Sequence, residues 1–233
     1  MKRHPFYLRW AGAFLLLVAV AFAPKYWLPL TMGQFDMPPD IHWHAVFTSL
    51  WILIFFFQSL LINRRKVRLH QLLGYLSLGI TLGVLISGFF VSLGLVERAL
   101  ASNNAGAKPL LLVNLLDLLM FGTLYTFGIL NRRNPLLHQR LMSITAIVLL
   151  NAAIFRIGRM FIGPGFSSVL LAIFLTSGIL FLFVWLEKRH SQQPNRKIWR
   201  IVIAIMVIHA IRIPLAITPI WADITDMLME VFA

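Results

Sequence analysis

Long apolar stretches alternate with short polar segments along almost the whole chain. Seven such stretches occur, at about residues 10–30, 42–62, 70–95, 109–130, 138–162, 166–186 and 199–220. Their lengths are close to the roughly 20 residues that an α-helix needs to cross the hydrocarbon core of a bilayer. The pattern therefore predicts an all-α integral membrane bundle of seven transmembrane helices, with the lipid bilayer as its main partner.

The composition agrees with a chain that lies mostly in lipid. Of 233 residues, 59% are hydrophobic and 12% are charged, whereas about a quarter of the residues of a soluble domain are charged. No polar segment is long enough for a separate soluble domain, so residues 1–233 are predicted to form one transmembrane domain. The chain contains no cysteine, which excludes disulfides, zinc–thiolate sites and thiol catalysis.

The basic residues lie on one side of the predicted bundle. The N-terminus and the segments near 63–71, 131–140 and 187–200 hold fifteen of the 21 Lys and Arg residues. Cytoplasmic loops carry such an excess, which predicts an N-in, C-out topology in a bacterial inner membrane. The net charge of +13 thus reflects topology, and nucleic-acid binding is rejected. The first stretch resembles a signal peptide, but Pro24 disfavours cleavage, and a retained first helix is predicted.

A short block occurs twice, and each copy separates two apolar stretches. Residues 62–74 read INRRKVRLHQLLG, and residues 130–142 read LNRRNPLLHQRLM. Because both copies lie on the basic side, residues 42–95 and 109–162 are predicted to be a parallel repeat of one helical hairpin. The last two stretches have the same topology. The predicted bundle therefore consists of one lone helix and three hairpins.

Few ionisable residues fall deep inside the predicted spans, where a charge is costly and each one is a candidate for function. They are Asp117, Arg156, Arg159, His209 and Arg212. Arg156 and Arg159 are three residues apart and share a helix face, as do His209 and Arg212. From the helix rise, Asp117, Arg156 and Arg212 are predicted roughly 9–12 Å below the outer boundary, with Arg159 shallower and His209 deeper.

The charge balance of this group predicts a ligand. Three arginines accompany one carboxylate, so two buried cations lack an acidic partner, and arginine recognises carboxylate and phosphate groups in a forked geometry. The predicted pocket lies in the outer half of the bilayer and holds a carboxylate, a lipid phosphate or a haem propionate. Its residues are His44, Asp117, Arg156, Arg159, His209 and Arg212. The alternative is structural: Asp117 and one arginine lock two helices together, and Arg159 reaches towards water.

Two histidines occupy equivalent positions in the duplicated block. His70 and His138 both stand at the inner start of a predicted helix. A b-type haem with two axial histidines needs them on different helices at one depth, a condition that this pair meets. His44 and His209 do not meet it, because their depths differ by roughly 14–16 Å. His70 and His138 are the candidate cofactor-binding residues, unless they only satisfy backbone groups or contact lipid headgroups. No metal-ion site is predicted.

The chain carries a helix start, His70–Gly74, of the form His-x-x-Leu-Gly. It continues with Asp117, with the block His138–Met142 of the form His-x-Arg-Leu-Met, and with Arg156 late in the following helix. This order resembles a group of bacterial multi-pass membrane proteins of unknown function. The resemblance covers roughly residues 42–160. It implies the same membrane-embedded site and implies no activity.

These observations predict a polytopic inner-membrane protein whose outer-facing polar pocket binds a haem-type or quinone-type redox cofactor. Two other interpretations stay open. One is a transporter or receptor for a small anionic ligand, and the other is an assembly partner that binds another membrane protein. The sequence holds no Walker, dinucleotide-binding or His-Glu-x-x-His motif, and it does not decide whether the protein is an enzyme.

Overall fold

The computed structural model describes residues 5–34, 36–163, 165–193 and 196–232. Within these ranges the chain is helical and has no strand. Seven of the described helical segments are long and apolar enough to cross a membrane, which confirms the predicted all-α bundle of seven spans. The elements are α1 (Pro5–Phe22), η1 (Ala23–Trp27), α2 (Leu28–Thr31), α3 (Pro39–Asn63), α4 (Val67–Ala101), η2 (Ala105–Ala107), α5 (Lys108–Leu130), α6 (Pro135–Phe161), α7 (Phe166–Ser191), α8 (Arg196–Ala216) and α9 (Pro219–Phe232).

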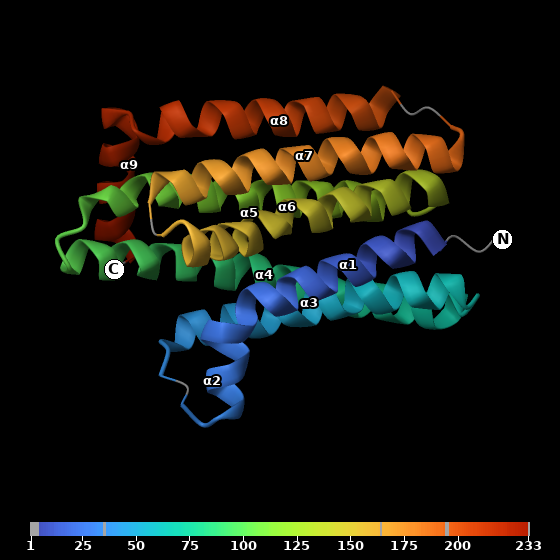
Figure 1. Ribbon diagram of the computed structural model, residues 1–233, viewed down its shortest axis with the longest axis horizontal. Coiled ribbons are helices and arrows are strands. Elements are labelled where there is room, and N and C mark those ends of the chain that lie inside the picture. Colours follow the sequence, from blue (N-terminus) through green and yellow to red (C-terminus); the bar gives the residue numbers. More distant parts are fainter. Residues whose placement is uncertain (1–4, 35, 164, 194–195, 233) are drawn as a thin grey trace.

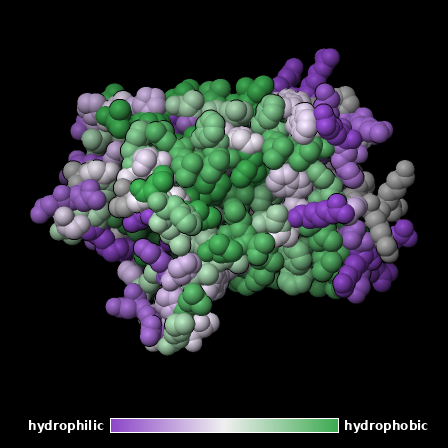
Figure 2. All heavy atoms as spheres, viewed as in Figure 1, coloured by the Kyte–Doolittle hydropathy of each residue, from purple (hydrophilic) through white to green (hydrophobic). Residues whose placement is uncertain are grey.

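The long helices lie side by side, and successive connections fall at alternate ends of the bundle (Figure 1). The α3–α4, α5–α6 and α7–α8 connections lie at the end where α1 begins, and twelve of the 21 Lys and Arg residues lie in or near them. We call this the inner end and the opposite one the outer end. Figure 2 shows a band of hydrophobic side chains around the middle of the visible face, with hydrophilic side chains gathered at both ends. The chain is therefore a multi-pass membrane protein.

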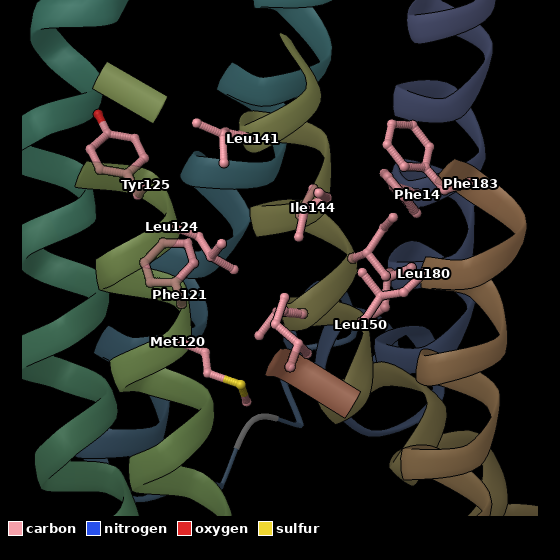
Figure 3. Packing of buried hydrophobic residues seen from close by; sticks show 14 of the residues in the cluster. Phe14, Met120, Phe121, Leu124, Tyr125, Leu141, Ile144, Leu150, Leu180 and Phe183 are labelled. Atoms are coloured by element: carbon pink, nitrogen blue, oxygen red, sulfur yellow. The ribbon is translucent and has the colours of Figure 1, made fainter. Parts of the chain in front are cut away.

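Helix α6 occupies the centre of the bundle. It packs against α1, α5 and α7, and it contributes more buried residues than any other described helix. In Figure 3, Leu141, Ile144 and Leu150 of α6 lie between the side chains of α5 and those of Phe14 and Phe183 from α1 and α7. The start of α6 is fixed locally, because Asn134 accepts a hydrogen bond from the Leu137 amide at 3.2 Å, as an N-cap residue does.

Helices α3 and α4 approach closely because one face of α4 carries small residues. A Cβ atom added at Gly83 would overlap the ring of Phe47, whereas nothing lies within 4 Å of a Cβ added at Gly79. One turn beyond Gly83, the hydroxyl of Ser87 meets His44 of α3. Small residues permit such close helix contacts in membranes, where apolar burial alone does not drive helices together.

Proline residues end the first span. Helix α1 passes at Ala23 into the π-helical turn η1, which contains Pro24, and α2 contains Pro29. Proline cannot donate the backbone hydrogen bond that continues an α-helix. In Figure 1, α2 accordingly runs away from the bundle axis at the outer end.

The outer end also carries α9, an element that the sequence analysis did not predict. The seventh span ends at Ala216, and α9 then crosses the bundle near α4 and α5 (Figure 1). Trp221 Nε1 donates to the Lys108 carbonyl oxygen at 3.1 Å, and Lys108 forms an ion pair with Asp226 at 2.6 Å. Helix α9 is therefore fastened to the outer end of α5.

Candidate functional site

Polar side chains from four helices meet in the outer half of the bundle. We call them the outer polar cluster, and its members are Asp117 of α5, Asn151 of α6, Thr176 and Ser177 of α7, and His209 and Arg212 of α8. Asp117 and Asn151 lie about 14–15 Å from the outer ends of their helices, at a rise of about 1.5 Å per residue. The cluster is therefore well inside a hydrocarbon core of roughly 30 Å.

An ion pair joins α5 to α8 at the centre of this cluster. Arg212 Nη1 donates to Asp117 Oδ1 at 2.6 Å, and Arg212 is fully buried. Asn151 Nδ2 donates to Asp117 Oδ2, also at 2.6 Å, and Thr176 Oγ1 lies 3.5 Å from Asn151 Oδ1. Both carboxylate oxygens thus have donors. One carboxylate balances one guanidinium at a depth where an unpaired charge would be costly.

Three nitrogen atoms of the cluster are buried without a hydrogen-bond partner. They are Nε and Nη2 of Arg212 and Nε2 of His209. His209 is 1% exposed, and its Nδ1 lies 3.0 Å from Ser177 Oγ, so the other edge of the ring is the unpartnered one. A buried polar group left without a partner costs roughly 1–3 kcal/mol. The cluster therefore has free hydrogen-bond donors that could donate to oxygen atoms of a ligand.

His44 and Arg156, predicted to share this pocket, lie in a second group. His44 Nδ1 is 3.1 Å from Ser87 Oγ, and the Arg156 guanidinium stacks 4.4 Å from the centroid of the Phe22 ring. Arg156 is close enough to His44 for the two to interact electrostatically. The ion pairs among the described residues do not include Arg156. Arg159 is exposed at the outer end of α6. Hydrogen bonds and an ion pair join Asp117 to Asn151 and Arg212, and none of those among the described residues joins His44 or Arg156 to this cluster.

At the inner end, the histidines of the two similar sequence blocks lie next to each other. The ring centroids of His70 and His138 are 6.3 Å apart, with the ring planes nearly perpendicular. His138 Nδ1 is 2.7 Å from the carbonyl oxygen of Gly128. Gln58 Nε2 donates to the His70 carbonyl oxygen at 3.0 Å, while Gln58 Oε1 and His70 Nδ1 are buried without a partner. We call His70 and His138 the inner histidine pair.

Sequence reasoning missed several polar residues. Arg140 was counted with the inner loops, yet it is 1% exposed, and its Nε lies 2.8 Å from Glu187 Oε2. Tyr7 donates to the other oxygen of Glu187 at 3.0 Å. This network ties α1, α6 and α7 together and is suited to a structural role. Asn151 was missed as well, although an amide side chain inside an apolar run was a usable signal.

Comparisons of the chain with protein-family models, with curated proteins and with solved structures found no match. Among the described residues, no three His, Asp or Glu side chains are grouped so that they alone could hold a metal ion. A surface cavity of about 290 Å³ lies at the outer ends of α3, α4 and α9, beside the ion pair of Asp40 and Arg98. Neither the outer polar cluster nor the inner histidine pair lines this cavity.

Proposed function

We propose that this multi-pass membrane protein binds the headgroup of a quinone in the outer polar cluster. The observation that carries the proposal is the set of buried, unpartnered nitrogen atoms on Arg212 and His209. A quinone ring presents carbonyl oxygens, which accept hydrogen bonds from such donors. Quinones also reside in the bilayer, which is the medium that surrounds this cluster.

The charge state of the cluster favours a neutral ligand over an anion. Asp117 and Arg212 already neutralise each other at 2.6 Å, so a bound carboxylate or phosphate would bring an uncompensated negative charge. A carbonyl oxygen adds no charge and still satisfies Nε and Nη2 of Arg212. When Ser177 donates to His209 Nδ1, the opposite nitrogen carries the ring hydrogen and becomes a second donor. Haem is less well supported here, because the cluster offers one imidazole rather than two.

Helix α8 provides a route for a ligand that arrives from lipid. Pro214 lies inside α8 two residues beyond Arg212, and it removes the backbone hydrogen bond to the carbonyl of Ala210. A helix is more easily bent where such a bond is missing. Movement of this segment would expose the unpartnered edge of His209 to the bilayer.

The proposal is tested by titrating the detergent-purified protein with a short-chain ubiquinone analogue and following the quenching of tryptophan fluorescence. His209→Leu removes one donor and leaves the Asp117–Arg212 pair in place. We expect binding to weaken about ten-fold or more, because a net hydrogen bond contributes roughly 0.5–1.5 kcal/mol and an orphaned partner costs more. His190→Ala is the matched control, since His190 stacks on Phe6 at the inner end. The proposal is refuted if the unaltered protein, His209→Leu and His190→Ala all bind the quinone analogue with the same affinity.

A second candidate function rests on the other polar group. Arg156 is a half-buried cation without a carboxylate partner among the described residues, next to His44. This arrangement favours the binding of a small carboxylate, as in a transporter or receptor that faces the outer side of a bacterial inner membrane. Arg156→Gln is expected to abolish thermal stabilisation by such carboxylates and to leave quinone binding unchanged. Loss of quinone binding in Arg156→Gln would contradict the separation of the two groups.

A further inference from the structure

The inner histidine pair has the arrangement of a metal site. His70 and His138 come from the two copies of the duplicated block and stand at the inner starts of α4 and α6. Metal–nitrogen bonds are about 2.0–2.1 Å long, so two imidazoles on opposite sides of one ion have ring centroids roughly 6.4 Å apart. The centroid distance here is 6.3 Å, which is the spacing of two imidazoles that bind one metal ion from opposite sides.

The hydrogen bond of His138 fixes which nitrogen is free. The Gly128 carbonyl oxygen can only accept, so His138 Nδ1, 2.7 Å away, must be the donor. In the neutral ring this leaves a lone pair on Nε2. A histidine that binds a metal usually donates its other ring N–H to a carbonyl or carboxylate in this way, which orients the ring. His138 is thus held in the tautomer that a ligand requires.

Further donor atoms surround the pair. His70 Nδ1 and Gln58 Oε1 are buried and have no hydrogen-bond partner. Met142 lies four residues after His138, on the same face of α6. The Met142 sulfur is packed against Gly128, 2.7 Å from where a Cβ atom of that glycine would stand. Gly128 is also the residue whose carbonyl oxygen holds His138, so the thioether and the histidine both contact the same residue of α5.

The chemistry of these donors selects the metal. All of them are neutral, and Glu187, the buried carboxylate at this end, is already paired with Arg140. A divalent ion would gain no neutralising ligand, and the basic α3–α4 and α5–α6 connections add positive charge nearby. Copper(I) carries a single charge, and soft thioether donors together with imidazole suit it. We infer that His70, His138 and Met142 form a copper(I) site at the inner membrane boundary.

This site is independent of the proposed quinone site, because the two share no residue and lie in opposite halves of the bundle. It also departs from the sequence analysis, which predicted no metal-ion site and gave the histidine pair as a candidate for haem, with a purely structural role as the alternative. A haem iron would fit the same ring spacing. A haem, however, also needs room for its macrocycle around the iron, whereas a single ion needs none.

The test is an anaerobic titration of the detergent-purified protein with copper(I), buffered by the chelator bicinchoninate. The absence of cysteine means that no thiolate competes for the ion. We expect one copper(I) per chain. His70→Ala and His138→Ala should each weaken binding by more than about 100-fold, the upper end of what loss of a supporting hydrogen bond costs. Met142→Leu keeps the packing and should weaken binding about ten-fold, which corresponds to one weak ligand bond.

His190→Ala is the matched control, because His190 also lies at the inner end but belongs to α7. It should bind copper(I) as the unaltered protein does. Thermal unfolding of every variant identifies those that fail to fold, and X-ray absorption of the copper-loaded protein should show sulfur and nitrogen neighbours. The inference is overturned by wild-type protein that loses copper(I) to the chelator, by tighter binding of zinc(II), or by an equal loss in His190→Ala. A purified protein with a haem Soret band that depends on His138 would also overturn it.

Discussion

Removal of the carboxylate from the outer polar cluster should destabilise the bundle strongly. Arg212 is fully buried, the Asp117 side chain is 18% exposed, and Nη1 lies 2.6 Å from Oδ1. Opposite charges about 4 Å apart attract by about 4 kcal/mol at an effective dielectric constant of about 20. In Asp117→Leu the guanidinium stays buried without this partner, and loss of one member of a buried pair costs about 3–5 kcal/mol. We expect the free energy of unfolding to fall by that amount.

The net contribution of the pair is smaller, because both charges lose their hydration when the protein folds. It is obtained from a double-mutant cycle with Asp117→Leu, Arg212→Met and the double variant. Neutral hydrogen bonds between membrane helices couple by about 0.6 kcal/mol on average and at most about 1.7 kcal/mol. For this charged pair, in which the arginine is fully buried and the aspartate largely so, we expect a coupling energy of about 2–3 kcal/mol, at the upper end for residues in one network. The double variant should be more stable than Asp117→Leu alone.

The assay is reversible unfolding in mixed micelles, followed by circular dichroism. The control is an identical cycle on the ion pair of Lys108 and Asp226, in which the aspartate is 52% exposed at the outer surface. An exposed pair of this kind couples by about 0.2–1 kcal/mol. The reasoning is refuted if both cycles give the same coupling energy, or if the double variant at Asp117 and Arg212 is less stable than either single variant.

Three further experiments test the packing, the inner network and the topology. Gly83→Val is expected to cost about 1–3 kcal/mol of unfolding free energy, because its side chain would overlap a ring of α3. Gly79→Val, which faces open space, should cost less than 1 kcal/mol in the same assay. Tyr7→Phe removes a hydrogen bond to a buried carboxylate and should lower the free energy of unfolding by about 1.5–3 kcal/mol. An unchanged unfolding midpoint would contradict this stabilising contribution of the hydrogen bond. Because the chain has no cysteine, Asn103→Cys should react with an impermeant maleimide on spheroplasts, whereas Arg133→Cys should react only after permeabilisation. The reverse labelling pattern would show that the predicted topology is inverted.

The seven spans could be predicted from the sequence because lipid imposes a simple pattern. A crossing segment must be apolar for about 20 residues whatever it packs against. Helix α9 was missed because it does not cross. Asp223, Asp226 and Glu230 recur every three or four residues among apolar ones, which is the pattern of a helix with one polar face rather than of a span. A search for apolar stretches alone does not detect such a helix.

Depth could be predicted for the candidate residues, but rotation about the helix axis could not. The helix rise placed Asp117 and Arg212 at similar depths, and their side chains meet. The same reasoning put Arg156 beside them. Asn151 and Arg156 are five residues apart, which is about 140° around the helix. Because α6 is surrounded by neighbours, Asn151 contacts Asp117 whereas Arg156 stacks on Phe22 of α1. Which neighbour lies at which angle depends on the packing of the whole bundle.

Equivalent residues of the two copies of the duplicated block differ in exposure at one position and agree at another. Two residues after each histidine, the first copy has Leu72, which is 65% exposed, and the second has Arg140, which is 1% exposed and bound to Glu187. This position has thus adapted to the lipid side of the bundle in one copy and to its centre in the other. His70 and His138, in contrast, are both half-buried, and the centroids of their rings lie 6.3 Å apart. The two histidines therefore share one environment and are neighbours in it. This favours a joint role, such as holding one ion, over two separate packing roles.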